Sequence, residues 1–433
     1  MILIENVDVI AVMDDAGTEM EGGSILIDGG AIRAVSPGRP AGAEGAEVID
    51  GRGLCAIPGL INTHHHLYQV LTRVRAQEQG LFGWLTELYP VWARLDAEWV
   101  HRAAGIGLSE LARSGCSTTT DHHYVFPAGR PGLIEAEIQA ADEIGIRFHP
   151  CRGSMDLGQS AGGLPPDSIV QDMDTILADT EALVRRFHDP SPGSMRQIAI
   201  GPCSPFSVSD RLMRESVALA RRLGVRLHTH IAETQDEEAF CRERFGTRPL
   251  TLLEEQGFLG EDVWLAHCVH LDRADIDRIR RTGTAVASCP SSNGRLGSGI
   301  APVPELVAAG VPVGFAVDGS ASNDAGNLLA EARQGMLMAR ARSGPGALTA
   351  RQALWIATRG GAACLGRSDI GSLRPGQRAD IALYRVDGDA ADGVIDQVAA
   401  LVFLFPRPVH HLFVEGRPVV RAGELVSASR VSP

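Results

Sequence analysis

The chain has 433 residues, of which 44% are hydrophobic and 21% charged, and its formal net charge at pH 7 is −13. This composition is typical of a globular enzyme and excludes an intrinsically disordered chain, which would carry fewer apolar residues and more net charge. The acidic balance argues against nucleic acid or an anionic membrane surface as a partner, because either would require a basic face.

We expect neither a targeting signal nor a disulfide framework. No apolar run is long enough to cross a bilayer, and residues 1–6 lack the basic segment and long apolar core of a secretion signal. The eight cysteines are scattered without a Cys-x-x-Cys pair, which is typical of reduced and buried thiols. We therefore expect a cytoplasmic protein.

Short strand-like segments occupy both ends of the chain. Residues 1–50 contain several, separated by glycines and acidic residues as turns require, and strand patterns return after residue 380 at 381–386, 398–404, 411–415 and 417–421. Chain termini often meet on the surface of a domain. We predict a discontinuous β-sandwich formed by residues 1–56 and 367–433.

The middle of the chain alternates between short apolar runs and amphipathic helical patterns. Strand and helix alternation sustained over eight units predicts a parallel sheet, and eight strands close a barrel. We predict a (β/α)8 TIM barrel over residues 57–366. The eight predicted strands are 55–62, 117–121, 147–151, 197–202, 225–230, 263–267, 285–289 and 311–317.

Potential metal ligands follow several of these strands, at the edge where barrel enzymes carry their catalytic groups. Histidine and aspartate suit zinc, and three or four of them leave a position open for water. Side chains alternate along a strand, so we expect His64 and His66 to share a face while His65 points away, and we expect the same alternation to separate His228 from His230. The strand-end groups are His64-His65-His66, His228, His230 with Glu233 beyond, His267 and Asp318.

Each of these residues also has an ordinary structural explanation. Asp318 before Gly319 can be a turn residue, and Glu233 can be an acid that suits the first turn of a helix. His122 and His123, after the second strand, are interpreted as residues behind the ligands rather than as ligands. The joint occurrence of such groups at the ends of strands one, five, six and eight favours a metal site.

With these motifs the sequence resembles the amidohydrolase superfamily, in its cytosine deaminase and chlorohydrolase branch, over almost its whole length. The resemblance implies that His64, His66, His230 and Asp318 are metal ligands, that Glu233 is the proton-shuttling acid, and that His267 polarises the attacking water or the substrate. The motifs are Pro-Gly-Leu-Ile-Asn-Thr-His-His-His at 58–66, His-Thr-His-Ile-Ala-Glu at 228–233, Ala-His-Cys at 266–268 and Val-Asp-Gly at 317–319.

Further segments resemble 8-oxoguanine deaminases within that branch, and isoxanthopterin deaminases and hydroxyatrazine aminohydrolases share several of them. One departure lies on strand seven, where relatives usually carry His-Cys-Pro and this chain has Ser288-Cys289-Pro290. The supporting segments are Leu-Tyr-Gln at 67–69, Phe-Gly-Trp-Leu at 82–85, Tyr-Pro-Val-Trp at 89–92, Arg-Gly-Ser-Met at 152–155 and Cys-Ser-Pro-Phe-Ser at 203–207.

The resemblance implies hydrolytic deamination of an oxidised purine or related amino-heterocycle, 8-oxoguanine above all, with one Zn²⁺ per subunit (Fe²⁺ or Mn²⁺ being possible). Glu233, His267 and Asp318 would carry the catalysis. We expect Gln69 to bind the ring amide edge, Arg152 a carbonyl oxygen, and Tyr68 and Trp84 to form apolar or stacking walls; packing for Trp84 and an ion pair for Arg152 are the alternatives.

Other functions stay open at this point. Guanine or isoxanthopterin deamination, or removal of amine or chloride from a triazine, would use the same metal site. A barrel scaffold without catalysis is a remote alternative, and a dinucleotide-dependent oxidoreductase lacks the required Gly-x-Gly-x-x-Gly turn. We expect a homo-oligomer, in which residues 83–91 form either a subunit contact or a lid.

Overall fold

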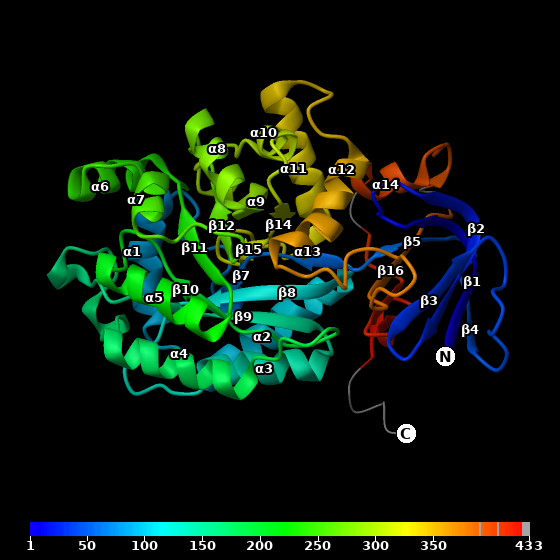
Figure 1. The fold of residues 1–433 in the computed structure, drawn as a ribbon, viewed down its shortest axis with the longest axis horizontal. Helices are drawn as coiled ribbons and strands as arrows, with labels where there is room; N and C mark the ends of the chain where they lie inside the picture. The colour runs from blue at the N-terminus through cyan, green and yellow to red at the C-terminus, as the bar shows by residue number, and fades with distance from the viewer. Residues whose placement is uncertain (389–390, 405–406, 427–433) are drawn as a thin grey trace.

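The computed structural model describes residues 1–388, 391–404 and 407–426. A barrel surrounded by helices forms most of the molecule, and a sheet built from both ends of the chain lies at one side of it (Figure 1). Among the described residues, no helix has the length and apolar character that spanning a bilayer requires.

The predicted barrel is confirmed. Its parallel sheet has eight strands in the order β14-β13-β12-β11-β10-β9-β8-β6, and most of their residues are buried because helices cover the outside. The strands are β6 (Leu60–Asn62), β8 (Cys116–His123), β9 (Arg147–Ser154), β10 (Ala199–Pro202), β11 (Leu227–Ile231), β12 (Val263–His267), β13 (Ala285–Ser288) and β14 (Val313–Phe315).

A short parallel pair closes the ring between the first and last strands. β7 (His65–His66) continues the chain after β6 and pairs with β15 (Asp318–Gly319), so that Asp318 lies opposite His65 and Gly319 opposite His66. One layer deeper, the Thr63 N–H donates to the Phe315 carbonyl at 3.2 Å. Two residues of this seam, His66 and Asp318, are among those predicted to bind metal.

The connecting helices follow the predicted amphipathic segments. In α2 (Ala97–Arg113), Asp96 caps the first turn by accepting the Trp99 N–H at 2.9 Å, and buried residues recur at helical spacing from Val100 to Leu111. The other helices are α1 (Leu81–Trp92), α3 (Leu133–Ile144), α4 (Met173–Phe187), α5 (Asp210–Leu223), α6 (Gln235–Phe245), α7 (Pro249–Glu255), α8 (Arg273–Thr282), α9 (Pro290–Arg295), α10 (Val303–Ala308), α11 (Leu328–Ser343), α12 (Ala350–Trp355) and α13 (Gly361–Cys364).

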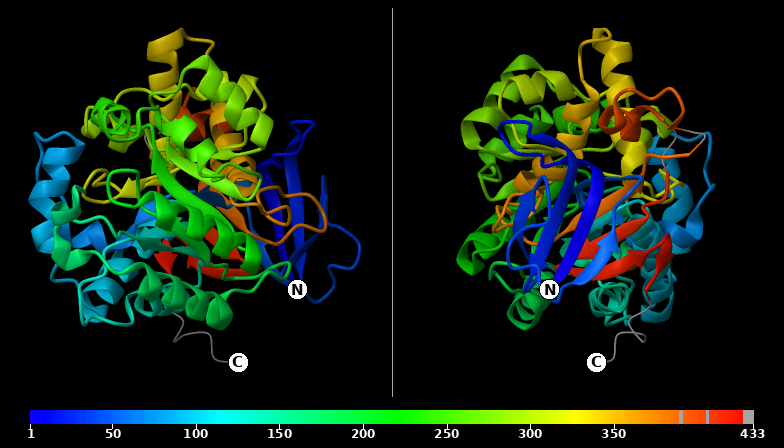
Figure 2. Two further views of the ribbon diagram at one scale, coloured as in Figure 1. Left: turned by 60° about the vertical axis from the view of Figure 1, so that its left-hand side comes forward. Right: turned by 90° about the vertical axis from the view of Figure 1, so that its right-hand side faces the viewer.

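The two ends of the chain form one sheet, as expected, with N-terminal and C-terminal strands side by side (Figure 2). Hydrogen bonds join its strands in the order β19-β18-β17-β16-β5-β1-β2-β3, with β4 beside β1. The strands are β1 (Ile2–Ala11), β2 (Glu19–Asp28), β3 (Ala31–Ser36), β4 (Glu47–Asp50), β5 (Leu54–Pro58), β16 (Ile381–Arg385), β17 (His411–Val414), β18 (Arg417–Arg421) and β19 (Glu424–Leu425).

Apolar side chains from both ends, such as Ile25 and Phe413, share one buried cluster. The domain boundary predicted after residue 56 falls inside β5, which pairs with β16 as far as Pro58 before the barrel begins at Leu60. Residues 427–433, predicted to belong to this sandwich, lie outside the described residues. The division into two domains stays a prediction.

One predicted strand is wrong. Residues 398–404 were expected to be extended, but α14 (Gln397–Phe403) is helical. Asp396 caps it by accepting the Ala399 N–H at 2.9 Å. The buried residues Val398, Leu401 and Val402 lie three and four positions apart, which is the spacing of one helix face. A short apolar run fits a strand or a helix equally, so the sequence pattern of these residues does not distinguish the two.

Candidate active site

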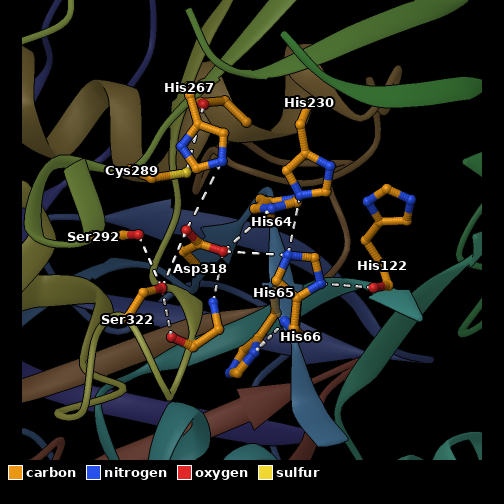
Figure 3. A network of polar contacts seen from close by, with 12 residues as sticks. His64, His65, His66, His122, His230, His267, Cys289, Ser292, Asp318 and Ser322 are labelled. Atoms are coloured by element: carbon orange, nitrogen blue, oxygen red, sulfur yellow. Dashed lines mark hydrogen bonds and ion pairs between the residues drawn. The ribbon is translucent and has the colours of Figure 1, made fainter. Parts of the chain in front are cut away.

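Four groups from three parts of the barrel converge on one point. His64 and His66 follow β6, His230 comes from β11, and Asp318 comes from β15 (Figure 3). The His64 and His66 Nε2 atoms lie 3.3 and 3.4 Å from Asp318 Oδ1, and the His66 and His230 Nε2 atoms are 3.1 Å apart. All four side chains are buried, so no bulk water separates them.

Hydrogen bonds made by the Nδ1 atoms fix the tautomers of two of these histidines. His66 Nδ1 donates to the His122 carbonyl at 2.7 Å, and His230 Nδ1 donates to the Cys203 carbonyl at 2.8 Å. Burial lowers the pKa of both imidazoles, so each carries one proton near neutral pH. Their Nε2 lone pairs therefore face each other, an arrangement that a shared cation would stabilise.

The donor set fits a zinc ion. Zinc binds histidine nitrogen and carboxylate oxygen at about 2.0–2.1 Å in a tetrahedron, whose edges are then about 3.3 Å long. The measured separations of 3.1–3.4 Å match such edges. His64 Nε2 is buried without a hydrogen-bond partner, as an atom reserved for a metal ion would be.

His65 does not belong to this group, as the alternation along the strand predicts. Its Nδ1 accepts the His66 backbone N–H at 2.7 Å, and its ring lies apart from the nitrogens around Asp318 (Figure 3). The predicted separation of His228 from His230 is wrong. Residues two apart on a strand share a face, and the His228 Nε2 lies 2.7 Å from His64 Nδ1, behind that ligand.

Asp318 is held in an unusual backbone conformation. Its φ is +62°, in the left-handed region that a residue with a side chain rarely adopts, and His267 has φ +71°. The Gly319 N–H donates to Asp318 Oδ1 at 2.7 Å. Burial alone would raise the pKa of Asp318, but His64 and His267 beside it hold that pKa well below its ordinary range. The carboxylate is therefore ionised and points toward the imidazoles.

Glu233 and His267 form the second part of the site. Glu233 Oε2 lies 3.6 Å from His267 Nε2, which is 3.9 Å from Asp318 Oδ2. Burial raises the pKa of Glu233 to about 7, so this acid can hold a proton at neutral pH. Burial would lower the pKa of His267, but the carboxylates of Glu233 and Asp318 more than offset it and raise that pKa.

Asn293 orients His267, and sequence reasoning missed it. Its Oδ1 lies 2.9 Å from His267 Nδ1 and accepts the proton there, so the Nε2 edge faces the two carboxylates. Asn293 follows strand seven in the segment whose usual histidine is replaced by Ser288. Ser288 itself is buried in β13, where its carbonyl accepts the Ala316 N–H at 2.9 Å.

A pocket opens above these groups. Trp84, a predicted substrate contact, lies in its lining, and its indole N–H donates to the Ala321 carbonyl at 3.1 Å. Tyr89, from the same helix α1, also contributes, so residues 83–91 form a wall of the pocket. The lining residues are His66, Leu81, Trp84, Leu85, Tyr89, Tyr124, Cys203, Ser204, Phe206, His230, Glu233, His267, Leu296, Asp318 and Ser322.

Tyr124, Ser204 and Ser322 in this lining were not predicted, although each follows a barrel strand and its position could have indicated it. Two predicted substrate contacts, Tyr68 and Gln69, lie one layer behind the lining. The Tyr68 ring packs against Tyr124 with 5.8 Å between centroids. Gln69 Nε2 lies 3.5 Å from the Tyr68 hydroxyl, and Gln69 Oε1 is buried without a partner.

Arg152, predicted to contact a substrate carbonyl, is not brought to the pocket. Its guanidinium donates to Asp179 at 3.0 Å, to Gln171 at 2.8 Å and to its neighbour Gly153 at 2.6 Å. It also lies 3.9 Å from the centre of the Phe126 ring. These contacts correct the prediction in favour of the structural ion pair, because the guanidinium is held by Asp179 and Gln171 and Arg152 is not among the residues that line the pocket.

The seam requires a glycine at position 319 because the Gln69 side chain leaves no room for a Cβ atom there. A Cβ atom there would lie 1.9 Å from Gln69 Oε1. We expect Gly319→Ala to lower the free energy of unfolding by about 1–3 kcal/mol, the usual cost of overpacking. Denaturant titration measures this, with Gly105→Ala in α2 as the control, since a Cβ there meets nothing within 4 Å. Equal effects of the two substitutions would contradict the expectation.

A second group of buried acids supports the chain next to His66. Asp121 Oδ1 accepts the Leu67 N–H at 2.5 Å, and Glu137 Oε1 lies 2.7 Å from His123 Nδ1. The ligand-type atoms of Asp121, His123 and Glu137 lie within 4.8 Å of one another. Burial raises the pKa of both acids well above their ordinary range.

This raised pKa predicts a pH-dependent effect of Glu137→Gln. A raised folded-state pKa contributes stability that is present below the unfolded pKa of about 4.3 and is lost as pH rises toward the folded value. The wild type should lose up to about 1.4 kcal/mol per pH unit through this group, and the variant should not. Melting temperatures at pH 5 and pH 7 measure the difference. A constant gap between the two proteins would contradict it.

Comparison with known proteins identifies the family. The amidohydrolase family model matches residues 55–419. The chain belongs to the amidohydrolase family. Over 395 residues this amidohydrolase is 47% identical to the 8-oxoguanine deaminase of Pseudomonas aeruginosa, covering 91% of this chain and 88% of that protein. It is 39% identical over 431 residues to hydroxydechloroatrazine ethylaminohydrolase of a Pseudomonas species, covering 95% and 89%.

The structure of this amidohydrolase also resembles a solved one. The crystal structure of atrazine chlorohydrolase from Arthrobacter aurescens, complexed with zinc, superimposes with a TM-score of 0.94 at 36% identity, and the match covers 98% of this chain and 96% of that one. The predicted resemblance and fold class are confirmed. The protein is a metal-dependent hydrolase that acts on carbon–nitrogen bonds.

Proposed function

We propose that this amidohydrolase uses zinc to deaminate an oxidised purine, most specifically 8-oxoguanine, to give urate and ammonia. One observation supports this chemistry: three neighbouring groups line the same pocket. Glu233, an acid able to hold a proton, lies beside His267, and His267 lies beside the Asp318 carboxylate. The similarity to 8-oxoguanine deaminase supports the substrate. The more general activity, hydrolysis of amino-heterocycles, rests on all three relatives.

The proposal assigns His64, His66, His230 and Asp318 as the residues that would hold zinc. When bound, zinc supplies Lewis-acid chemistry, which brings the pKa of water from about 15.7 down toward 7. Asp318 Oδ2 accepts the first proton of the attacking water, because this carboxylate is ionised and faces the site. His267 donates from Nε2 to the attacking oxygen and stabilises its developing charge.

Glu233 gives its proton to the ring nitrogen next to the amino-bearing carbon, which prevents full negative charge from building on the ring. The proton held by Asp318 passes to the amine, which leaves as ammonia. The remaining hydroxyl proton returns to Glu233 as the carbonyl forms. One water is consumed, and both of its protons are accounted for, one on ammonia and one on the product ring.

The pocket walls fit a flat heterocycle. Trp84 and Tyr124 supply aromatic faces or edges, while Ser204 and Ser322 supply hydroxyls. Gln69 and Tyr68, one layer behind, would act on the substrate through Tyr124 and the Asp318–Gly319 turn rather than by direct contact. The proposal makes no use of Arg152.

A release assay tests the substrate, and it follows ammonia for the three amino-heterocycles and ethylamine for hydroxyatrazine. The zinc-loaded protein is given 8-oxoguanine, isoxanthopterin, guanine and hydroxyatrazine separately, and we expect the highest kcat/KM with 8-oxoguanine. Preference for hydroxyatrazine would move the function to the triazine hydrolases, which the 39% identical relative supports as the second candidate. No hydrolysis of any of the four would overturn the proposal. Assembly into oligomers and a cytoplasmic location stay predictions.

A further inference from the structure

His64 differs from the other proposed histidine ligands in the hydrogen-bond partner of its Nδ1 atom. His66 and His230 donate from Nδ1 to backbone carbonyls. His64 Nδ1 faces another imidazole instead, the Nε2 of His228 at 2.7 Å. Each of these two nitrogens can donate or accept, so the pair alone does not decide which ring carries the proton.

The next contact decides it. His228 Nδ1 lies 2.8 Å from the Trp264 carbonyl oxygen, which can only accept, so the His228 proton is on Nδ1. Both imidazoles are completely buried, and a neutral imidazole carries its single proton on only one of its two nitrogens. His228 Nε2 is then an acceptor, and His64 donates to it from Nδ1. The His64 lone pair is left on Nε2, the atom 3.3 Å from Asp318 Oδ1.

Trp264 holds both members of this pair in place. Its ring stacks on His228 with 4.4 Å between centroids and 13° between planes. Its indole N–H donates to the carbonyl of Thr63, the residue before His64, at 3.0 Å. The His228 ring therefore has one fixed orientation, set by a residue on the neighbouring strand β12.

We infer that His228 is a positioning residue for the metal site: it fixes the tautomer and orientation of His64 and so sets the affinity for zinc. This inference rests on the proposed zinc site. His228 is not among the residues that line the pocket, so it acts through His64 alone. Partners behind a metal-bound histidine typically change metal affinity by about 10- to 100-fold.

Zinc affinity measured by competition with a chromophoric chelator tests the inference without using activity. We expect His228→Leu, which removes the acceptor, to raise the zinc Kd by about 10- to 100-fold. His228→Gln offers a carbonyl oxygen near the position of Nε2 and should restore most of the affinity. His65→Asn serves as the control for loss of a buried histidine, because His65 faces away from the proposed ligands.

His228→Asn guards against misfolding of the leucine variant, since its shorter amide stays polar but does not reach His64. The glutamine variant should bind zinc more tightly than the asparagine variant. Equal zinc affinity in the wild type and His228→Leu, or in the two amide variants, would overturn the inference. A wild-type protein that binds no zinc would instead overturn the proposed metal site.

Discussion

Replacing Glu233 with glutamine should lower kcat by about 100- to 10,000-fold, the usual contribution of a positioned proton donor. Glutamine fills the same volume but has no proton to give to the ring nitrogen. Glu233 is not within the proposed ligand set of His64, His66, His230 and Asp318, so bound zinc should stay near that of the wild type. Steady-state ammonia release and metal analysis of the same preparation measure the two quantities.

Glu238→Gln is the matched control for this variant. Glu238 lies on α6, a few residues beyond Glu233, and forms an exposed ion pair with Arg242 at 2.8 Å. Neutralising it should leave kcat within a few-fold of the wild type, because exposed ion pairs contribute little. A Glu233→Gln protein with full activity would remove Glu233 from the mechanism, whatever the metal content.

Loss of His66 should abolish both zinc binding and activity. His66 Nε2 contacts two other members of the proposed ligand set, His230 at 3.1 Å and Asp318 at 3.4 Å. In His66→Asn the shorter amide removes the Nε2 lone pair from the site. The Asp318 carboxylate and the His230 lone pair then lose the third group with which they would bind zinc. Zinc retained after gel filtration is measured by atomic spectrometry, and we expect at least a tenfold loss of retained metal with activity falling in parallel.

His65→Asn provides the comparison within the same triplet. The asparagine Oδ1 can accept the His66 N–H that His65 Nδ1 now accepts, so the strand should keep its shape. Zinc content should match the wild type. If the two variants lost zinc equally, the assignment of faces along this strand would be incorrect.

The barrel and the position of the site could be predicted because both depend on local patterns. Alternating apolar runs and amphipathic segments indicate a parallel sheet, and the carboxyl ends of parallel strands meet at one edge. That rule alone brought His64, His230 and Asp318 together from distant parts of the sequence. Helix α14 was missed because a seven-residue apolar segment does not distinguish a strand from a helix.

The substrate contacts could not be predicted in the same way. Whether Arg152 reaches the pocket depends on Asp179 and Gln171, which lie on other parts of the chain and take its donors first. Asn293 and Tyr124 have no motif of their own, since an amide or a phenol at a strand end is common. His228 and His230 lie two residues apart on β11 and so share a face, contrary to the prediction, and the contact of His228 with Trp264 on β12 exists only in the folded barrel.

The seam between β7 and β15 has a consequence for how the protein is made. The proposed ligands come from both sides of it, with His64 and His66 near the start of the barrel and Asp318 after its last strand. During synthesis a ribosome must release nearly the whole barrel before Asp318 can reach the histidines, so the full set of proposed ligands forms only when the ring closes. A metal ion bound to that set would stabilise the closed barrel over the open chain.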